Sequence, residues 1–230
     1  MSSEHVVAVI VAGGVGKRLN LKVHKSFVRL GEKPMLAWTL EAFEKARSVG
    51  RIVLVVHPSD IEATQRMIRF FGYRKVLRVV RGGASRMASV SFGLRALPPD
   101  AKWVAVHDGA RPLVRPELIE ATLKAARGPK AAIAAIPIIP TVKQARGSWV
   151  EKTLDRKRLW AVQTPQVFDR KLLEQAHAKG RTNGSAATDD AALVEALGHR
   201  VRIVMGDHRN LKVTTPEDLV MAQALLRRRR

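Results

Sequence analysis

The amino-acid sequence predicts an α/β fold, a doubly wound and mostly parallel β-sheet with a protruding β-hairpin arm. Three observations support this prediction. Short runs rich in valine, isoleucine and alanine alternate with segments whose apolar residues recur at helical spacing, which is the pattern of β-α-β units. Glycine-rich or polar segments follow several of the apolar runs. The alternation breaks once, between residues 138 and 159, where a hairpin fits better than another β-α unit.

The strands are expected at the apolar runs, which are short and rich in β-branched residues. Near-continuous apolar runs are typical of strands that are buried on both faces, so helices should cover both sides of the sheet. The expected strands are residues 6–12, 51–57, 76–80, 103–107, 131–137 and 200–205.

The segments between these runs are expected to be helices. In the first of them, Leu36, Leu40 and Phe43 fall on one stripe at helical spacing. Pro116 precedes another, and proline is favoured in the first turn of a helix. The expected helices are residues 35–47, 61–71, 87–97 and 117–126, with three more beginning at about Asp169, at Asp189 and at Pro216.

The arm is expected at about residues 138–158. Pro140, Gly147 and a run of charged residues at 151–158 interrupt the α/β pattern. Residues 141–144 and 149–153 can pair as a hairpin around 145–148. A hairpin without a covering helix leaves one face poorly buried, so we expect the arm to bury that face against a partner subunit.

Length and composition indicate a single globular domain, residues 1–230, that carries this dimerisation arm. Apolar residues make up 46% of the chain, which argues against disorder. The absence of cysteine excludes disulfides, thiolate catalysis and cysteine-bound metals. No apolar run approaches the roughly 20 residues that span a bilayer, and the N-terminus has no signal-peptide pattern. We therefore expect a cytoplasmic protein with no membrane partner.

The net charge of +21 predicts attraction to polyanions. Nucleic-acid binding is one explanation, and a phosphate-rich active site is another. The basic residues are spread along the chain, and aromatic residues make up only 5%, so stacking platforms for single strands are scarce. No specific nucleic-acid partner is expected.

A glycine-rich loop follows the first strand. Gly13, Gly14 and Gly16 allow a sharp turn that presents backbone N–H groups to phosphates, with cations supplied by Arg18 and Lys25. The spacing is not that of a Walker A loop, and the third glycine of a dinucleotide fingerprint is missing. An ordinary strand-to-loop turn is the alternative to a polyphosphate site.

The ordered motifs of the chain resemble those of the 2-C-methyl-D-erythritol 4-phosphate cytidylyltransferase family. They run in family order from about residue 6 to 226, and no single motif is decisive. The matching segments are residues 12–18 with Lys25, Gly82-Gly83 with Arg86 and Ser89-Val90, residues 106–112, 141–143, 155–156, 159–160, 164–166, 188–189, 212–214 and 216–218.

This resemblance implies a Rossmann-like nucleotidyltransferase that joins the cytidylyl group of CTP to 2-C-methyl-D-erythritol 4-phosphate and releases pyrophosphate, on the non-mevalonate route to isoprenoid precursors. Such a transfer relies mainly on positioning and cationic stabilisation. By resemblance, Arg18 and Lys25 stabilise the pentavalent transition state. The residues implied to hold the nucleotide are Ala12, Gly13, Gly14, Gly16, Gly82, Gly83 and Ser89.

The resemblance also assigns the acceptor side of the site. Asp108 is implied to lie near the acceptor and near Mg²⁺ or another divalent cation, which the CTP phosphates mainly hold. Lys212 and Arg111 of one chain, with Thr141 and Arg156 from the arm of its partner in a homodimer, are implied to position the acceptor phosphate. On residue type alone, each cation could equally be a solvated surface group. We expect His107 to be a buried structural residue and Thr188–Asp190 to cap a helix.

Three positions depart from the family pattern. His24 stands where the family usually has a proline before the lysine, so the loop is expected to be less rigid. Ala84 replaces a common acidic residue near the nucleotide, and Gly109 replaces a common alanine. None of these departures removes a group with an implied catalytic role.

Rival functions remain open on sequence alone. A cytidylyltransferase for another polyol phosphate, such as ribitol 5-phosphate, would share the fold and most motifs. A basic nucleic-acid-binding protein without turnover would instead predict salt-sensitive RNA binding. A nicotinamide dehydrogenase is disfavoured by the incomplete glycine fingerprint.

Overall fold

The central feature of the fold is a seven-stranded β-sheet in strand order β11-β7-β10-β6-β1-β4-β5. The computed structural model describes residues 6–14, 24–182 and 187–228. Neighbouring strands are parallel except around β10, which runs antiparallel to both β6 and β7. The strands are β1 (Val6–Ala12), β4 (Arg51–Val56), β5 (Val76–Arg81), β6 (Trp103–Asp108), β7 (Ala131–Pro137), β10 (Trp160–Asp169) and β11 (Arg202–Met205).

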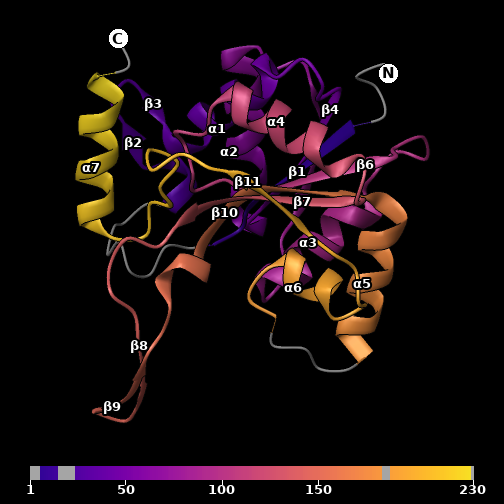
Figure 1. Cartoon of the computed structure of the whole chain (residues 1–230). Coiled ribbons are helices and arrows are strands. Elements are labelled where there is room, and N and C mark those ends of the chain that lie inside the picture. Colours follow the sequence, from indigo (N-terminus) through magenta and orange to yellow (C-terminus); the bar gives the residue numbers. More distant parts are fainter. Residues whose placement is uncertain (1–5, 15–23, 183–186, 229–230) are drawn as a thin grey trace.

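Helices cover both faces of this sheet (Figure 1). One face packs against α1 (Met35–Lys45), α2 (Ile61–Phe71) and α4 (Pro116–Ala126), and the other packs against α3 (Arg86–Arg95), α5 (Arg170–Thr182) and α6 (Asp190–Glu195). Side chains alternate between the faces along each strand. In β1, Ala8 and Ile10 enter the first core, whereas Val7 and Val9 enter the second, and all four are fully buried. The doubly wound fold predicted from the apolar runs is confirmed.

Helix boundaries follow local sequence signals. Leu36, Leu40 and Phe43 of α1 are fully buried, as their spacing predicts, although this helix ends at Lys45 rather than at residue 47. Helix α2 spans the predicted residues and ends at Gly72, whose φ of 68° is the left-handed conformation that favours glycine at a helix end.

A third, smaller apolar cluster holds the C-terminal helix α7 (Pro216–Arg227) against the short hairpin of β2 (Arg29–Leu30) and β3 (Lys33–Pro34). Leu30, Met35 and Leu226 are among the buried members of this cluster. Helix α7 begins at the predicted proline, behind a capping box between Thr215 and Asp218. Because Val213 also belongs to the cluster, this packing fixes the segment that carries Lys212.

The arm is a two-stranded antiparallel hairpin of β8 (Lys143–Arg146) and β9 (Trp149–Thr153) that extends away from the rest of the molecule (Figure 1). Every residue of both strands is exposed, and Trp149 is 79% exposed. The predicted hairpin is confirmed, but its first strand begins at Lys143 instead of residue 141. Gly147 makes the turn with a φ of 57°.

Strand β10 is the main element that sequence patterns did not indicate. Its polar residues do not follow the apolar pattern expected of a buried strand, although β10 lies inside the sheet between β6 and β7. Gln163, Thr164 and Gln166 are buried, and their side chains are satisfied by hydrogen bonds. Gln166 Oε1, for example, accepts hydrogen bonds from the backbone N–H groups of Asp190 and Ala191, both at 3.2 Å.

Within the described residues, no helix is both long and apolar enough to cross a bilayer.

Candidate active site

A cavity of about 470 Å³ lies at the carboxyl ends of β1, β4, β5 and β6. This edge of an open parallel sheet is where ligands bind in such folds. The loops that follow these four strands supply most of the lining, together with the start of α3. The lining residues are Val11, Ala12, Gly13, Gly14, Lys25, Ser26, Met35, His57, Gly83, Ala84, Ser85, Arg86, Ser89, Asp108, Gly109, Ala110 and Lys212.

Two glycines of this lining stand where neighbouring loops approach each other closely. A Cβ atom at Gly83 would lie 2.5 Å from the Cβ of Ala88, and one at Gly109 would lie 2.9 Å from the Cβ of Ala12. Gly109, where the family commonly has alanine, therefore fits a close approach between the loops after β1 and β6. The loops pack directly against each other and leave backbone groups facing the cavity.

The start of α3 faces the same cavity. Ser85 caps this helix, since its side chain accepts a hydrogen bond from Ala88 N at 3.1 Å. Ser89 Oγ donates to Ser85 O at 2.9 Å and accepts from Gly83 N at 3.0 Å, which joins the glycine loop to the helix. The positive end of the helix dipole and its unpaired N–H groups favour an anion at this place.

Asp108, at the end of β6, lies between two cations. Its Oδ1 accepts from Arg86 Nε at 3.1 Å, and its Oδ2 pairs with Lys212 Nζ at 2.8 Å. Burial alone would raise the pKa of Asp108, but the charges of Arg86 and Lys212 outweigh it and hold the pKa well below its ordinary value. The group is therefore a carboxylate at any physiological pH, and it fixes one cation on each side.

Arg86 is a cationic lining residue that the sequence-based site assignment left out. Its guanidinium also pairs with Asp190 Oδ2 at 2.7 Å, and Asp190 Oδ1 lies 2.9 Å from His177 Nε2. Burial would lower the pKa of Arg86, but the two carboxylates raise it above its ordinary value. Its place after Gly82-Gly83 in the second family motif was the signal that could have identified it. The expected helix cap is confirmed at Asp189, whose side chain accepts from Ala192 N.

Most of the predicted nucleotide and catalytic residues meet in this cavity. Ala12, Gly13, Gly14, Lys25, Gly83, Ser89, Asp108 and Lys212 line it, and Gly82 lies directly behind it, with its N–H donated to Val56 O at 2.6 Å. Gly16 and Arg18 lie outside the described residues. His107 is fully buried, as expected for a structural residue, with its Nδ1 3.0 Å from Thr164 Oγ1.

Three residues predicted to position the acceptor lie outside this lining. Arg111 is buried, and its guanidinium donates to the backbone carbonyls of Asn210 at 2.6 Å and Val162 at 3.3 Å. In this arrangement it fixes the loops beside the cavity. Thr141 and Arg156 are exposed at the base of the arm, where Arg156 Nη1 donates to Ile139 O at 2.5 Å.

Lys25 enters the cavity from a short 3₁₀ helix, η3 (Lys25–Phe27). Ser26 Oγ donates to Ala12 O at 2.9 Å, so this turn is joined to the end of β1. His24, in the family's proline position, has a φ of −62°, which is a value that proline itself adopts. Its Nδ1 lies 2.7 Å from Asp60 Oδ1, so a side-chain contact links the segment before Lys25 to the start of α2.

Glycine loops, a helix start and cations at this edge of a mostly parallel sheet suit a phosphate-bearing nucleotide, and the chain's relatives make the class a nucleotidyltransferase. The sequence profile of 2-C-methyl-D-erythritol 4-phosphate cytidylyltransferases matches residues 6–228, and the chain belongs to this family. The family resemblance seen in the motifs is thereby confirmed.

Individual relatives agree with this assignment. The chain is 46% identical over 227 residues to the 2-C-methyl-D-erythritol 4-phosphate cytidylyltransferase of Desulforamulus reducens, covering 98% of this chain and 97% of that one. It is 44% identical to the protein of the same name from Geobacillus kaustophilus, covering 95% of this chain and 96% of the relative. The crystal structure of 4-diphosphocytidyl-2C-methyl-D-erythritol synthase from Anaerococcus prevotii matches with a TM-score of 0.87 and 32% identity, over 98% of this chain and 99% of that chain.

Proposed function

We propose that this chain transfers the cytidylyl group of CTP to 2-C-methyl-D-erythritol 4-phosphate in isoprenoid precursor biosynthesis. An oxygen of the acceptor phosphate attacks the α-phosphorus of CTP and forms a new P–O bond. The bond from that phosphorus to the bridging oxygen of the β-phosphate breaks, so that 4-diphosphocytidyl-2-C-methyl-D-erythritol forms and pyrophosphate leaves. The observation that carries this proposal is the cavity of a family member whose lining combines glycines from several loops with the cations Lys25, Arg86 and Lys212.

The chemistry requires cations and no general base. The acceptor phosphate is already an anion at neutral pH, since its second pKa is about 6. Negative charge accumulates at the α-phosphorus as the pentavalent centre forms, and we assign its stabilisation to Lys25 and Arg18. Asp108 keeps its charge and holds Lys212 towards the acceptor side, so it acts as a positioning residue.

A divalent cation, in the first instance Mg²⁺, is part of this proposal. Asp108 is the only carboxylate among the described residues that line the cavity, and both its oxygens are already paired with cations. This donor set does not form a protein cage for Mg²⁺. It does fit an ion that is held mainly by phosphate oxygens and water, with Asp108 as a nearby negative charge. The ion would offset the charge of the triphosphate.

We further propose a homodimer of single-domain subunits in which each arm completes the neighbouring site. The arm exposes Trp149 and Val150, at 79% and 61%, and Ile139 at its base is 65% exposed, which together is a large apolar surface. Thr141 and Arg156 lie at its base, away from the cavity of their own chain, and are available to a partner's acceptor phosphate. Because the reaction consumes CTP, a cytoplasmic metabolite, we place the enzyme in the cytoplasm.

Pyrophosphate release from CTP and Mg²⁺ tests the proposal, with 2-C-methyl-D-erythritol 4-phosphate and ribitol 5-phosphate as parallel acceptors. Turnover is expected with the first acceptor only. Turnover with ribitol 5-phosphate instead would support cytidylyl transfer but to a different acceptor, outside isoprenoid precursor biosynthesis. If a folded dimeric sample releases no pyrophosphate with either acceptor and binds RNA in a salt-sensitive way, the nucleic-acid-binding alternative is favoured.

A further inference from the structure

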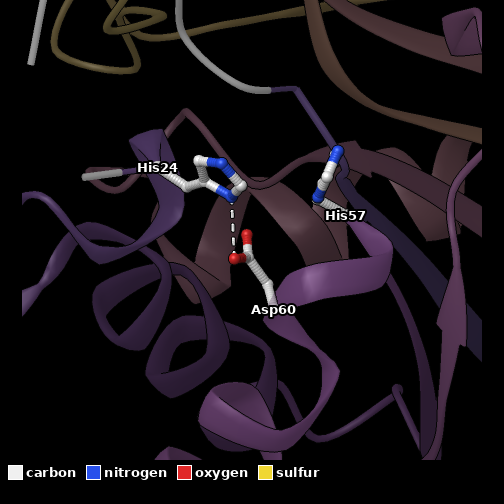
Figure 2. Close-up of side chains that lie close together, drawn as sticks. All are labelled: His24, His57 and Asp60. Atoms are coloured by element: carbon white, nitrogen blue, oxygen red, sulfur yellow. Dashed lines mark hydrogen bonds and ion pairs between the residues drawn. The ribbon is translucent and has the colours of Figure 1, made fainter. Parts of the chain in front are cut away.

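A second group of polar side chains lies at the edge of the cavity and has no role in the proposed transfer. It consists of His24, His57 and Asp60, which approach one another from two segments of the chain (Figure 2). His24 precedes η3, His57 follows β4, and Asp60 ends the short 3₁₀ helix η4 (Pro58–Asp60) at the start of α2. One ring nitrogen of each histidine and one carboxylate oxygen of Asp60 all lie within 4.8 Å of one another.

The carboxylate of Asp60 is the unusual member of this group. The residue is 7% exposed, and its Oδ2 is buried without a hydrogen-bond partner among the described residues. It does not cap α2, although it occupies the N-cap position. Its Oδ1 contacts His24 and, at 3.4 Å, the hydroxyl of Ser59. A buried carboxylate oxygen without a partner is costly, and a cation is the ligand that would satisfy it.

We propose that His24, His57 and Asp60 bind a transition-metal dication of the Zn²⁺ class. Two imidazole nitrogens and one carboxylate oxygen are a common three-ligand set for such ions, with further positions left to water or a ligand. Mg²⁺ prefers oxygen ligands alone, so this site is chemically distinct from the proposed triphosphate-held ion.

The geometry needs only a small adjustment to hold such an ion. Bond lengths of about 2.0–2.1 Å in a tetrahedral site place ligand atoms about 3.4 Å apart. His24 Nδ1 and Asp60 Oδ1 are already 2.7 Å apart, and the two imidazole rings lie 4.7 Å apart between centroids. The side chain of His24 is 33% exposed, and the ring of His57 is held by Ser59 Oγ, which lies 2.8 Å from its Nδ1.

The site would join two segments that are distant in the sequence, the turn before Lys25 and the turn between β4 and α2. His57 lines the cavity, and His24 directly precedes Lys25, which also lines it. A bound ion would therefore tie the segment before Lys25 to the start of α2. Because a ligand that binds only the folded state stabilises it, saturating Zn²⁺ is expected to raise the melting temperature.

Zn²⁺ titration of the untagged full-length chain tests the proposal, by calorimetry, without nucleotide and in excess Mg²⁺. We expect one equivalent of Zn²⁺ to bind, and Co²⁺ to give the visible absorption of a bound, low-coordinate ion. His24→Gln and His57→Gln should each weaken Zn²⁺ binding about a hundredfold. His24→Pro should do the same while keeping the backbone φ. The matched control is His199→Gln, an exposed histidine outside the cluster, which should leave Zn²⁺ affinity unchanged.

Unchanged Zn²⁺ affinity in both His24→Gln and His57→Gln would overturn the proposal. Equal weakening in His199→Gln would do so too, because it would indicate adventitious binding to surface histidines. Melting curves without metal confirm that each variant is folded, which is expected because both histidines are partly exposed. Zn²⁺ binding is measured without CTP, so its outcome does not depend on the proposed transferase activity.

Discussion

Individual side chains of the site divide between those that meet the reacting phosphates and those that hold other side chains in place. Asp108 belongs to the second group, because its two oxygens are occupied by Arg86 and Lys212. Arg86 is in turn fixed by Asp190 from α6. This chain of ion pairs is partly buried, so removing one member would leave a charge without its partner. Lys25 and Arg18 are left as the cations proposed to act on the α-phosphorus.

Replacing either of these cations should slow the chemical step. We expect Lys25→Ala and Arg18→Ala each to lower kcat at least about a hundredfold, because each removes a charge that stabilises the transition state. Pyrophosphate release measures the effect, and melting temperature should stay within about 2 °C of wild type. Lys124→Ala, on the exposed surface of α4, is the control for loss of a positive charge. Normal turnover in both cavity variants would remove these residues from the mechanism.

His107 should make stability depend on pH in a defined window. Burial lowers the pKa of His107 to about 3, below the ordinary value of about 6.5 in the unfolded chain. Between these values the unfolded state binds the extra proton, so stability rises with pH and levels off about one pH unit above 6.5. From pH 6.5 to 5 the loss is about 2 kcal/mol.

Urea unfolding of His107→Gln across that window measures this contribution. The variant should lose about 2 kcal/mol less than wild type between pH 6.5 and 5, whatever its stability at pH 7. His199→Gln, which replaces an exposed histidine, should keep the wild-type pH dependence. If the free energy of unfolding of His107→Gln changes with pH as it does in wild type, the buried imidazole of His107 is not the source of the pH dependence.

Structural elements of the site depend on close backbone contacts, and the loop after β5 offers the clearest test. Gly83→Ala would place a Cβ atom 2.5 Å from Ala88 Cβ, so the loop must move away from α3. We expect the KM for CTP to rise about tenfold or more, since this loop faces the nucleotide. Gly128→Ala is the matched control, because nothing lies within 4 Å of a Cβ at that position. A wild-type KM in Gly83→Ala would show that the loop is not part of the nucleotide site.

Elements with a repeating pattern were predictable from the sequence, whereas elements stabilised by long-range polar contacts were not. Strand β1 and helix α2 have the predicted bounds because their apolar periodicity matches their burial. Strand β10 has no such pattern, because its middle is held by buried amide and hydroxyl groups. No local rule identifies partners that are 23 to 57 residues away.

The site shows the same division. Glycine loops after strands marked the cavity correctly, since strand ends of a parallel sheet meet at one edge. The role of Arg86 depends on Asp190, which is 104 residues distant, and could not be read from spacing. Arg111 was assigned to the acceptor from the family motif, yet in this structure its guanidinium binds backbone carbonyls. The family motif marked it as a phosphate ligand, but only the fold shows where the side chain points.

The whole molecule is proposed to be a dimer in which each active site draws on both chains. No other described helix or strand covers the arm (Figure 1), and its apolar residues Trp149 and Val150 are exposed. Arg156 lies at the base of the arm. Within the described residues, its guanidinium hydrogen-bonds only to the backbone carbonyl of Ile139. A C₂ dimer would carry two such arms and two cavities, so a defect in an arm would affect the partner's site.

Mixing two impaired variants should therefore restore activity. Lys25→Ala disables the cavity of its own chain, and Arg156→Ala should raise the KM for the acceptor in the partner's cavity. In a mixed dimer, one site carries both defects and the other carries neither. Random exchange makes half of the dimers mixed, so about a quarter of wild-type activity should return at acceptor concentrations below KM.

Pyrophosphate release before and after subunit exchange measures this recovery, with native mass spectrometry to show that mixed dimers form. Lys25→Ala mixed with the double variant Lys25→Ala/Arg156→Ala should recover nothing, because every cavity then lacks its lysine. Recovery in the first mixture alone would place Arg156 in the neighbouring site. If mixed dimers form and activity stays at the level of the separate variants, each chain must build its site alone, and the exposed arm would serve dimerisation only.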